Sequence, residues 1–304
     1  MLTFTAAQKV FSWGDTSTGG QPGERPPVLI GSIFFSGHRI VSDPIKGVFD
    51  KARARDLLTA EAELAEAYGL KRMIDVVGDT EEALVRYIEF VAAHTEDPIL
   101  VDSSFTEVRL KACRHFKGTE VWPRLVYNSI DEHHTEKDWE ELAELGLEAA
   151  VVLAFSSRAL QPAAVLRLLA GEDGRGGLLG RAQAIGIKKL LVDVGCLDVP
   201  GTARSALLIK EVKDKLGYPA GCAPSNAFHT WQKSRFREEG EMVAAGAAVY
   251  AVPLLWGADF IFYGPIRHAR WVYPACAAAS AVVAYGARQG GVRPVKNHPL
   301  YKIF

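Results

Sequence analysis

The stretch Leu190–Thr202 reads LLVDVGCLDVPGT, and its pattern decides the fold that the sequence predicts. An apolar run ends in a carboxylate, Asp193, and then breaks into a turn that contains glycine. Apolar runs without strict alternation are typical of parallel strands that are buried on both faces. Comparable runs recur along the chain: VLIGSIFF, RMIDVVG, PILVDSS, PRLVYNSI, EAAVVLAF, AGCAPSNAF and DFIFYGP.

Helical periodicity fills the segments between these runs. Residues 56–69, DLLTAEAELAEAYG, end in a glycine that suits a helix C-cap, and residues 80–94 open on Thr80 with glutamates in the first turn. Residues 201–217 close with lysines and a glycine in the same way. About eight strand–helix units in this order predict an α/β fold, the (β/α)8 TIM barrel, whose usual length is about 250 residues.

The predicted domain organisation is a single barrel domain over residues 1–304. Within it we expect an N-terminal lead-in over 1–25, the barrel over 26–290 and a C-terminal tail over 291–304. A doubly wound open sheet is the alternative, and the barrel is favoured because no linker or change in composition marks a second domain. The glycine-rich insert at 171–180, GEDGRGGLLG, is expected to be a surface loop between two helices, Pro162–Leu169 and Leu178–Ile185.

Composition and charge exclude several classes of function. The chain has 304 residues, of which 48% are hydrophobic, and a formal net charge of -1, so no nucleic-acid partner is expected. The apolar segment WVYPACAAASAVVAYG is shorter than the roughly 20 residues of a membrane span and is interpreted as a buried helix. Four widely spaced cysteines and an N-terminus without a signal-peptide pattern predict a reduced, cytoplasmic protein.

Five polar side chains stand where predicted strands end. Because the carboxyl ends of barrel strands open at one mouth, these side chains are expected to converge on a ligand. The alternative is that each of them caps the following helix or hydrogen-bonds its own loop. The five are Asp75, Asp102, Asn128, Asp193 and Asn226.

The chemistry of these groups leaves two kinds of ligand open. An ionised carboxylate accepts hydrogen bonds, so an aspartate can bind the adjacent ring N–H and amino group of a planar heterocycle, and an amide can donate to a ring nitrogen or carbonyl. A hard cation such as Mg²⁺ also prefers carboxylates. The residue types alone do not separate these two ligands.

Three segments carry a resemblance to a known family: GGQPGERPPVLIGSIFFSGHRIV, RMIDVVGDTEEALVRYIEFV and RLVYNSID. They closely resemble the H subunit of tetrahydromethanopterin S-methyltransferase. They also resemble the bacterial methylcobamide:tetrahydrofolate methyltransferases of glycine betaine and methylamine catabolism. The similarity continues to the C-terminal NHPLYKIF, and both groups are similar to the pterin-binding barrels of the dihydropteroate synthase type.

The resemblance implies a barrel whose mouth binds a small-molecule pterin and no metal. Asp102, Asn128 and Asp193 then correspond to residues that bind the pterin ring. Asp75 corresponds to a further substrate-binding acid, and Asn226 to the catalytic residue near N5.

The reaction that the resemblance implies is methyl transfer between the methyl-Co(III) of a corrinoid and N5 of tetrahydrofolate, which forms methyltetrahydrofolate. The corrinoid, as methylcobalamin, is expected on a carrier protein, and the resemblance also suggests a homodimer. Two other interpretations stay open. One is a subunit of a membrane-attached complex that uses tetrahydromethanopterin, and the other is a pterin-binding scaffold without catalytic activity.

Other motifs give weaker signals. The segment DEHHTE at 131–136 lacks the glycine of the cobalamin-binding pattern D-x-H-x-x-G and is expected to be a loop. Cys196, Cys222 and His229 suggest a zinc–thiolate site, but no H-x-C pattern is present, and the cysteines are interpreted as buried small side chains. His38, which follows the first barrel strand, is expected to be either a polar rim residue or a catalytic one.

Overall fold

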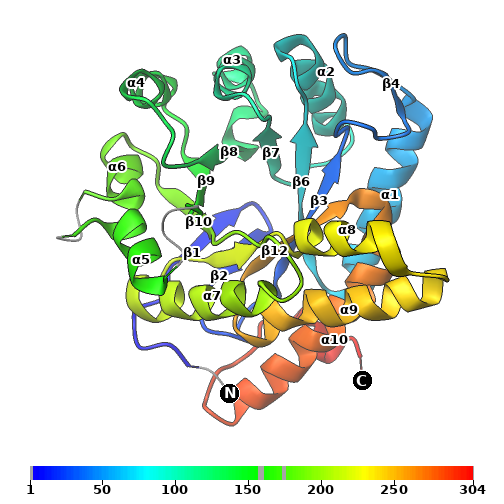
Figure 1. Cartoon of the computed structure of the whole chain (residues 1–304), viewed down its shortest axis with the longest axis vertical. Helices are drawn as coiled ribbons and strands as arrows, with labels where there is room; N and C mark the ends of the chain where they lie inside the picture. The colour runs from blue at the N-terminus through cyan, green and yellow to red at the C-terminus, as the bar shows by residue number, and fades with distance from the viewer. Residues whose placement is uncertain (1–2, 157–160, 173–175, 304) are drawn as a thin grey trace. The chain divides into compact units, whose positions relative to one another are not determined.

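The computed structural model describes residues 3–156, 161–172 and 176–303, without the side chains of 232–235. Its central feature is a closed parallel barrel in the strand order β10-β11-β12-β3-β6-β7-β8-β9, with helices between the strands along the chain (Figure 1). The predicted (β/α)8 barrel is therefore confirmed. The barrel strands are β3 (Val28–Ile33), β6 (Lys71–Val77), β7 (Ile99–Asp102), β8 (Leu125–Ile130), β9 (Ala149–Leu153), β10 (Lys189–Asp193), β11 (Ala220–Cys222) and β12 (Phe260–Pro265).

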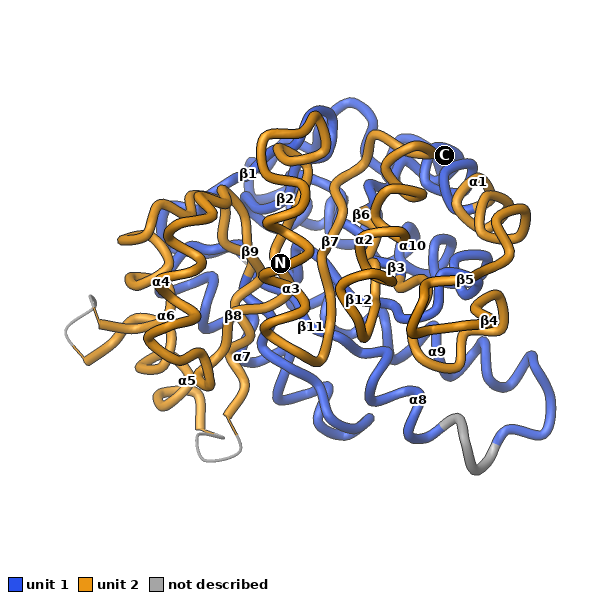
Figure 2. The backbone as a smooth tube through the Cα atoms, turned by 90° about the horizontal axis from the view of Figure 1, so that it is seen from above, with its two compact units in different colours: residues 1–31, 61–72, 192–304 blue, residues 32–60, 73–191 orange. Residues whose placement is uncertain are grey.

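The chain divides into two compact units, which Figure 2 shows in different colours. Unit 1 comprises Met1–Gly31, Glu61–Arg72 and Val192–Phe304, and unit 2 comprises Ser32–Ala60 and Met73–Leu191. Helix α1 (Lys51–Tyr68) contributes residues to both. The predicted site residues divide accordingly: unit 2 holds Asp75, Asp102 and Asn128, and unit 1 holds Asp193 and Asn226.

In unit 2 the strands β6, β7, β8 and β9 are hydrogen-bonded side by side. Helix α2 begins as predicted at Thr80, whose hydroxyl accepts the Ala83 N–H at 3.1 Å. Residues 131–135 form the expected loop. The other elements of this unit are β4 (Val41–Asp43), β5 (Val48–Phe49), α2 (Glu81–Ala92), α3 (Thr106–Phe116), η1 (Trp122–Arg124), α4 (Glu136–Leu145), α5 (Pro162–Ala170) and α6 (Leu178–Ala184).

The glycine-rich insert at 171–180 follows α5 and runs into α6, the two helices that we expected on either side of it. Its last three residues belong to α6, which begins at Leu178. Residues 173–175 of the insert lie outside the described part of the chain. The predicted helix start at Leu178 is therefore confirmed.

In unit 1 the lead-in forms an antiparallel hairpin of β1 and β2. The Lys9 N–H donates to the Gly217 carbonyl at 2.7 Å, and the Thr18 hydroxyl donates to the Asp259 carbonyl at 3.2 Å. The hairpin thus contacts the chain just before β11 and β12. The remaining elements of this unit are β1 (Val10–Trp13), β2 (Thr16–Gly19), α7 (Thr202–Leu216), α8 (Pro224–Arg235), α9 (Glu239–Leu255), η2 (Ile266–His268), α10 (Ala269–Arg288) and η3 (Pro299–Tyr301).

Two helices end at the glycines that the sequence predicts. Gly69 follows α1 with φ +66, and Gly217 follows α7 with φ +67. Both angles lie in the left-handed region, where a side chain would clash with the backbone, so glycine is the favoured residue. These two turns fix where the chain leaves the helices for β6 and β11.

Strand β11 is shorter than the run AGCAPSNAF predicts. It ends at Cys222, and α8 begins at Pro224. Proline suits the first helical position because that residue needs no N–H donor and because the ring already fixes a helical φ. The prediction that Asn226 stands at a strand exit is therefore wrong, because Asn226 lies in the first turn of α8.

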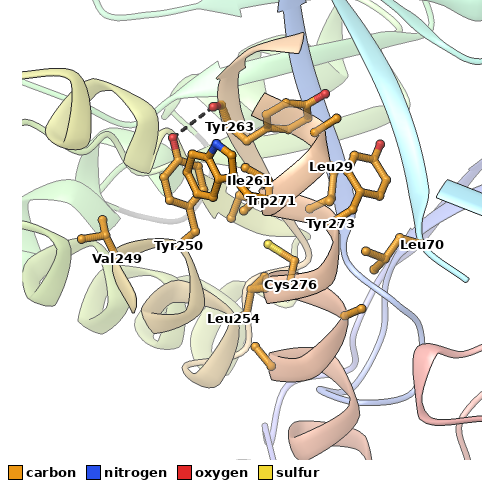
Figure 3. Close-up of a cluster of buried hydrophobic side chains, with 14 of the residues drawn as sticks. Leu29, Leu70, Val249, Tyr250, Leu254, Ile261, Tyr263, Trp271, Tyr273 and Cys276 are labelled. Carbon is orange, nitrogen blue, oxygen red and sulfur yellow. Dashed lines mark hydrogen bonds between the residues drawn. The ribbon is translucent and has the colours of Figure 1, made fainter. Parts of the chain in front are cut away.

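Aromatic side chains of α9 and α10 pack on β12 and β3 in the core of unit 1 (Figure 3). The Tyr250 hydroxyl donates to the Tyr263 carbonyl at 3.0 Å, and the Tyr250 and Trp271 rings meet edge to face at 5.2 Å. The apolar segment 271–286 is part of α10 and is largely buried, as predicted. Among the described residues, no helix combines the length and apolar character that crossing a membrane requires.

A buried ion pair joins α7 to the residue before β12. Lys213 Nζ lies 2.5 Å from each carboxylate oxygen of Asp259 and 3.0 Å from the carbonyl oxygen of Gly20. Asp259 also accepts the Ala220 N–H at 2.9 Å. Because the Lys213 side chain is fully buried, its charge depends on Asp259 for compensation.

Replacing Asp259 with asparagine should leave the Lys213 ammonium buried without its counter-charge. We expect the free energy of unfolding to fall by about 3–5 kcal/mol, as measured by urea denaturation followed by circular dichroism. The exposed pair of Lys215 and Glu211 provides the matched control, because Lys215→Met should change the same free energy by less than about 1 kcal/mol. Equal losses in the two variants would contradict the importance of the buried pair.

Candidate active site

Side chains from four adjacent strands meet around Asp75 in unit 2. The Ser32 hydroxyl of β3 donates to Asp75 Oδ2 at 2.7 Å, and the Asn128 amide of β8 donates to Asp75 Oδ1 at 3.2 Å. The carboxyl group of Asp102, at the end of β7, is hydrogen-bonded to that of Asp75 on β6. The structure therefore brings together the three predicted site residues that belong to this unit.

Strand register explains why these side chains meet. Asp102 is the partner of Asn128 across β7 and β8, and Val77 is the partner of Asp102 across β6 and β7. Asp75 lies two residues before Val77, and side chains two apart on a strand share a face. Asp75 therefore lies on the same face of the sheet as Asp102. It is two residues before Val77, the residue that pairs with Asp102.

Burial keeps this carboxyl pair partly protonated. It raises the pKa of Asp75 to about 6, although hydrogen bonds from Ser32, Asn128 and Asp102 act in the opposite direction. Burial also raises the pKa of Asp102 well above its usual range, the negative charge of Asp75 adds to this effect, and the charge of Arg109 opposes it. Adjacent carboxyl groups of this kind titrate as a pair and share a proton, and the hydrogen bond between them lowers the pKa of Asp75 and raises that of Asp102.

Arg109 of α3 is a buried cation beside this pair that our sequence analysis missed. Its guanidinium donates to the Ser103 carbonyl, to the Thr106 hydroxyl at 3.0 Å and to the Ser129 carbonyl at 3.3 Å. It also lies over the Tyr127 ring, 5.1 Å from the centroid. Arg109 thus connects the loop that follows Asp102 to the end of β8. The available signal was a charged residue on the apolar face of a predicted helix.

Asp193 ends β10 in unit 1 and is buried, with 8% of its surface exposed. Its Oδ1 accepts the Gly195 N–H at 2.8 Å. This hydrogen bond to its own loop is the alternative to ligand binding that the sequence analysis left open. Burial raises the pKa of Asp193 to about 7, although the Gly195 hydrogen bond lowers it. Within the described residues Oδ2 has no hydrogen-bond partner, so this oxygen is available to a ligand that donates.

Asn226 and His229 are exposed on the first turns of α8 in unit 1. The Asn226 N–H donates to the Ala223 carbonyl at 3.1 Å, and the Asn226 carbonyl accepts the Thr230 hydroxyl at 3.1 Å. These are backbone contacts of a helix start, and they leave the Asn226 amide facing solvent. Its proposed contact with N5 stays a prediction.

His38 and the cysteines, the remaining candidates from the sequence, are buried. His38 is buried, its Nδ1 accepts the Phe34 N–H at 3.1 Å, and its ring stacks on Phe35 at 4.6 Å. It supports Phe34, whose φ of +67 is unusual for a residue with a side chain. All four cysteines are buried as predicted, and the described residues contain no group of three or more His, Cys, Asp or Glu that could hold a metal ion.

The fold and these groups define a (β/α)8 barrel that holds buried carboxyl groups at the ends of its strands, where enzymes of this fold carry their active sites. The model of the family described as "Tetrahydromethanopterin S-methyltransferase MtrH subunit" matches residues 6–295, and the chain belongs to this family.

Curated relatives match over their whole length. They are H subunits of tetrahydromethanopterin S-methyltransferase. The chain is 34% identical to the one from Methanothermobacter thermautotrophicus and 35% identical to the one from Methanococcus vannielii, in each case over 100% of both chains.

Dihydropteroate synthases are among the solved structures that share this fold. The enzyme of Coxiella burnetii, in complex with pteroic acid, aligns with a TM-score of 0.60 at 14% identity, covering 86% of this chain and 94% of that one. The enzyme of Yersinia pestis aligns with a TM-score of 0.59 at 14% identity, covering 90% and 98%. At these identities the likeness supports the fold alone.

The raised pKa values predict a stability that falls as the pH rises. In the unfolded chain an aspartate loses its proton near pH 4, whereas burial raises the pKa of folded Asp75 to about 6 and that of Asp102 well above its usual range. The folded state therefore binds more protons over this window, and the free energy of unfolding declines by about 1.4 kcal/mol per pH unit for each such group. We expect Asp102→Asn to flatten this decline and to raise the stability at pH 7.

Urea denaturation at a series of pH values measures this effect. Asp193, whose pKa is also raised, should leave a residual slope in the Asp102→Asn variant. Asp56 is exposed on α1, so Asp56→Asn is the control and should keep the slope of the wild type. An unchanged slope in Asp102→Asn would contradict the shared proton.

Proposed function

We propose that this chain is a methyltransferase subunit that moves a methyl group between N5 of a reduced pterin and the cobalt of a corrinoid on a partner protein. The family and the full-length relatives support a complex that acts on tetrahydromethanopterin. They favour this alternative over the free tetrahydrofolate enzyme that we expected first. The corrinoid carrier is then another subunit, other subunits attach the complex to the membrane, and no relative supports the expected homodimer.

The observation that carries the proposal is the buried cluster of Asp75, Asp102 and Asn128, in which burial raises the pKa of both acids. A reduced pterin presents a ring N–H and an amino group on its pyrimidine edge, and carboxylates accept from both. A carboxyl pair that retains one proton near neutral pH is also an acid that a leaving nitrogen can use. A scaffold that only binds the pterin would need no such acid.

The chemistry requires a proton at N5 in each direction. When the methyl group leaves N5 for Co(I), the electron pair of the broken bond stays on nitrogen, and a proton must neutralise it. In the reverse direction the N5 lone pair attacks the methyl group of methyl-Co(III), Co(I) leaves with its electron pair, and N5 releases a proton. We assign the exchange of this proton to the pair of Asp102 and Asp75.

Asp193 is assigned to the pyrimidine edge of the pterin through its free Oδ2. Asp193 is the last residue of its strand β10, and the carboxyl ends of barrel strands are where enzymes of this fold bind their ligands. The burial of Asp193 supports this assignment, because a buried carboxylate with an unused oxygen gains when a ligand donates to it.

Asp193→Ala should weaken pterin binding by about 10- to 100-fold, because a buried hydrogen bond to a charged group is worth about 1.5–3 kcal/mol. Isothermal titration calorimetry of the full chain with tetrahydromethanopterin measures the affinity. Asp56→Ala changes an exposed carboxylate on α1 and should bind like the wild type. Wild-type affinity in Asp193→Ala would remove this residue from the site.

The reaction is tested by mixing the full chain with methyl-tetrahydromethanopterin and cob(I)alamin and following the absorbance of methylcobalamin. Asn226→Ala should lower kcat by about 100-fold with little change in KM, because a hydrogen bond to N5 would act mainly in the transition state. Thr230→Val, one turn further along α8, is the control.

We expect the methanopterin derivative to react faster than methyltetrahydrofolate. Absence of transfer with both, even with a carrier protein added, would favour the scaffold.

A further inference from the structure

Two cysteines of unit 1 lie at the ends of neighbouring strands. Cys222 is the last residue of β11, and Cys196 follows the end of β10 by three residues. The strands are paired at Asp193 and Gly221, which precede the two cysteines. Both thiols are buried, Cys196 with 4% of its surface exposed, and they are hydrogen-bonded to each other.

The surroundings of Cys196 favour a thiolate. Its sulfur lies 3.6 Å from the hydroxyl of Thr202, the first residue of α7, so it faces the amino-terminal end of a helix, where negative charge is stabilised. The hydrogen bond from Cys222 and the contact with Thr202 lower the pKa of Cys196 to about 6, against the effects of burial and of the nearby Asp198. The same hydrogen bond and burial raise the pKa of Cys222, which stays a thiol.

The other two cysteines provide an internal comparison. Cys113 in α3 and Cys276 in α10 are fully buried, and burial raises the pKa of each. Neither is hydrogen-bonded to a second cysteine among the described residues. Reactivity that depends on a thiolate beside a second thiol is therefore expected only at the pair of Cys196 and Cys222.

We propose that Cys196 and Cys222 form a redox modification site in which a peroxide converts the two thiols into a disulfide and a dithiol reductant restores them. The Cys196 sulfur attacks one peroxide oxygen, the O–O bond breaks, and the departing oxygen leaves as water after taking a proton, which gives a sulfenic acid. The Cys222 sulfur then attacks the Cys196 sulfur, the S–O bond breaks, and a second water leaves with the Cys222 proton. Two thiols are oxidised and one peroxide is reduced.

Trypsin separates the two cysteines, which makes the disulfide easy to detect. Cleavage releases Cys196 in residues 190–204 and Cys222 in residues 216–233. After treatment of the full chain with hydrogen peroxide, we expect mass spectrometry to find these two peptides joined, with a mass about 2 Da below their sum because two hydrogens are lost. Dithiothreitol should separate them again.

Two variants control the experiment. Cys276→Ser should form the same joined peptides as the wild type. Cys222→Ser should instead leave Cys196 as a sulfenic acid that dimedone labels, which shows the reactive thiol even if the disulfide geometry changes. Recovery of both peptides as free thiols after peroxide treatment would overturn the proposal, and so would dimedone labelling of Cys196 in Cys222→Ser no faster than that of Cys113.

Discussion

The cost of burying two carboxyl groups side by side governs the arrangement of unit 2. Two adjacent negative charges away from water repel each other strongly, and Arg109 donates to the carbonyls of Ser103 and Ser129 instead of to the acids. Burial raises the pKa of both acids and so favours a state with one proton between them, and donors from Ser32 and Asn128 stabilise the charge on Asp75. Each contributor comes from a different strand, so the pair depends on the register of β3, β6, β7 and β8.

Unit 1 also contains a buried carboxylate, but there a cation compensates its charge. Asp259 is buried as Asp75 is, but it meets the ammonium of Lys213 at 2.5 Å and a backbone N–H of Ala220. A cation at this distance favours the ionised carboxylate, so the pair is a fixed structural contact. The carboxylate of Asp259 is compensated by a cation, whereas Asp75 and Asp102 share a proton. Such a proton can be exchanged with a ligand. This difference separates a stabilising acid from one that can take part in a reaction.

Much of the fold could be predicted from local patterns. Thr80, Gly69 and Gly217 act on their own helix ends, so neighbouring residues suffice to recognise them. Asp75, Asp102 and Asn128 were recognised because each follows a buried apolar run.

The unpredicted features depend on contacts between distant segments. Ser32 resembles an ordinary polar residue within a strand until Asp75, 43 residues further along the chain, accepts its hydrogen bond. Arg109 acquires its role only when the end of β8, which contains Ser129, lies next to it. Strand β11 was drawn too long because Pro224 suits both the end of a strand and the first position of a helix.

The choice between the two candidate pterins cannot come from the acids at the strand ends. Tetrahydrofolate and tetrahydromethanopterin share the amino-pyrimidine edge, and a carboxylate such as Asp193 would accept the same two donors from either. Discrimination therefore requires groups that contact the parts of the ligand beyond this edge, and the relatives that match the whole chain are named for tetrahydromethanopterin. In the proposed function the acid groups bind the shared edge and exchange the proton, so the choice of pterin would depend on residues that contact the rest of the ligand.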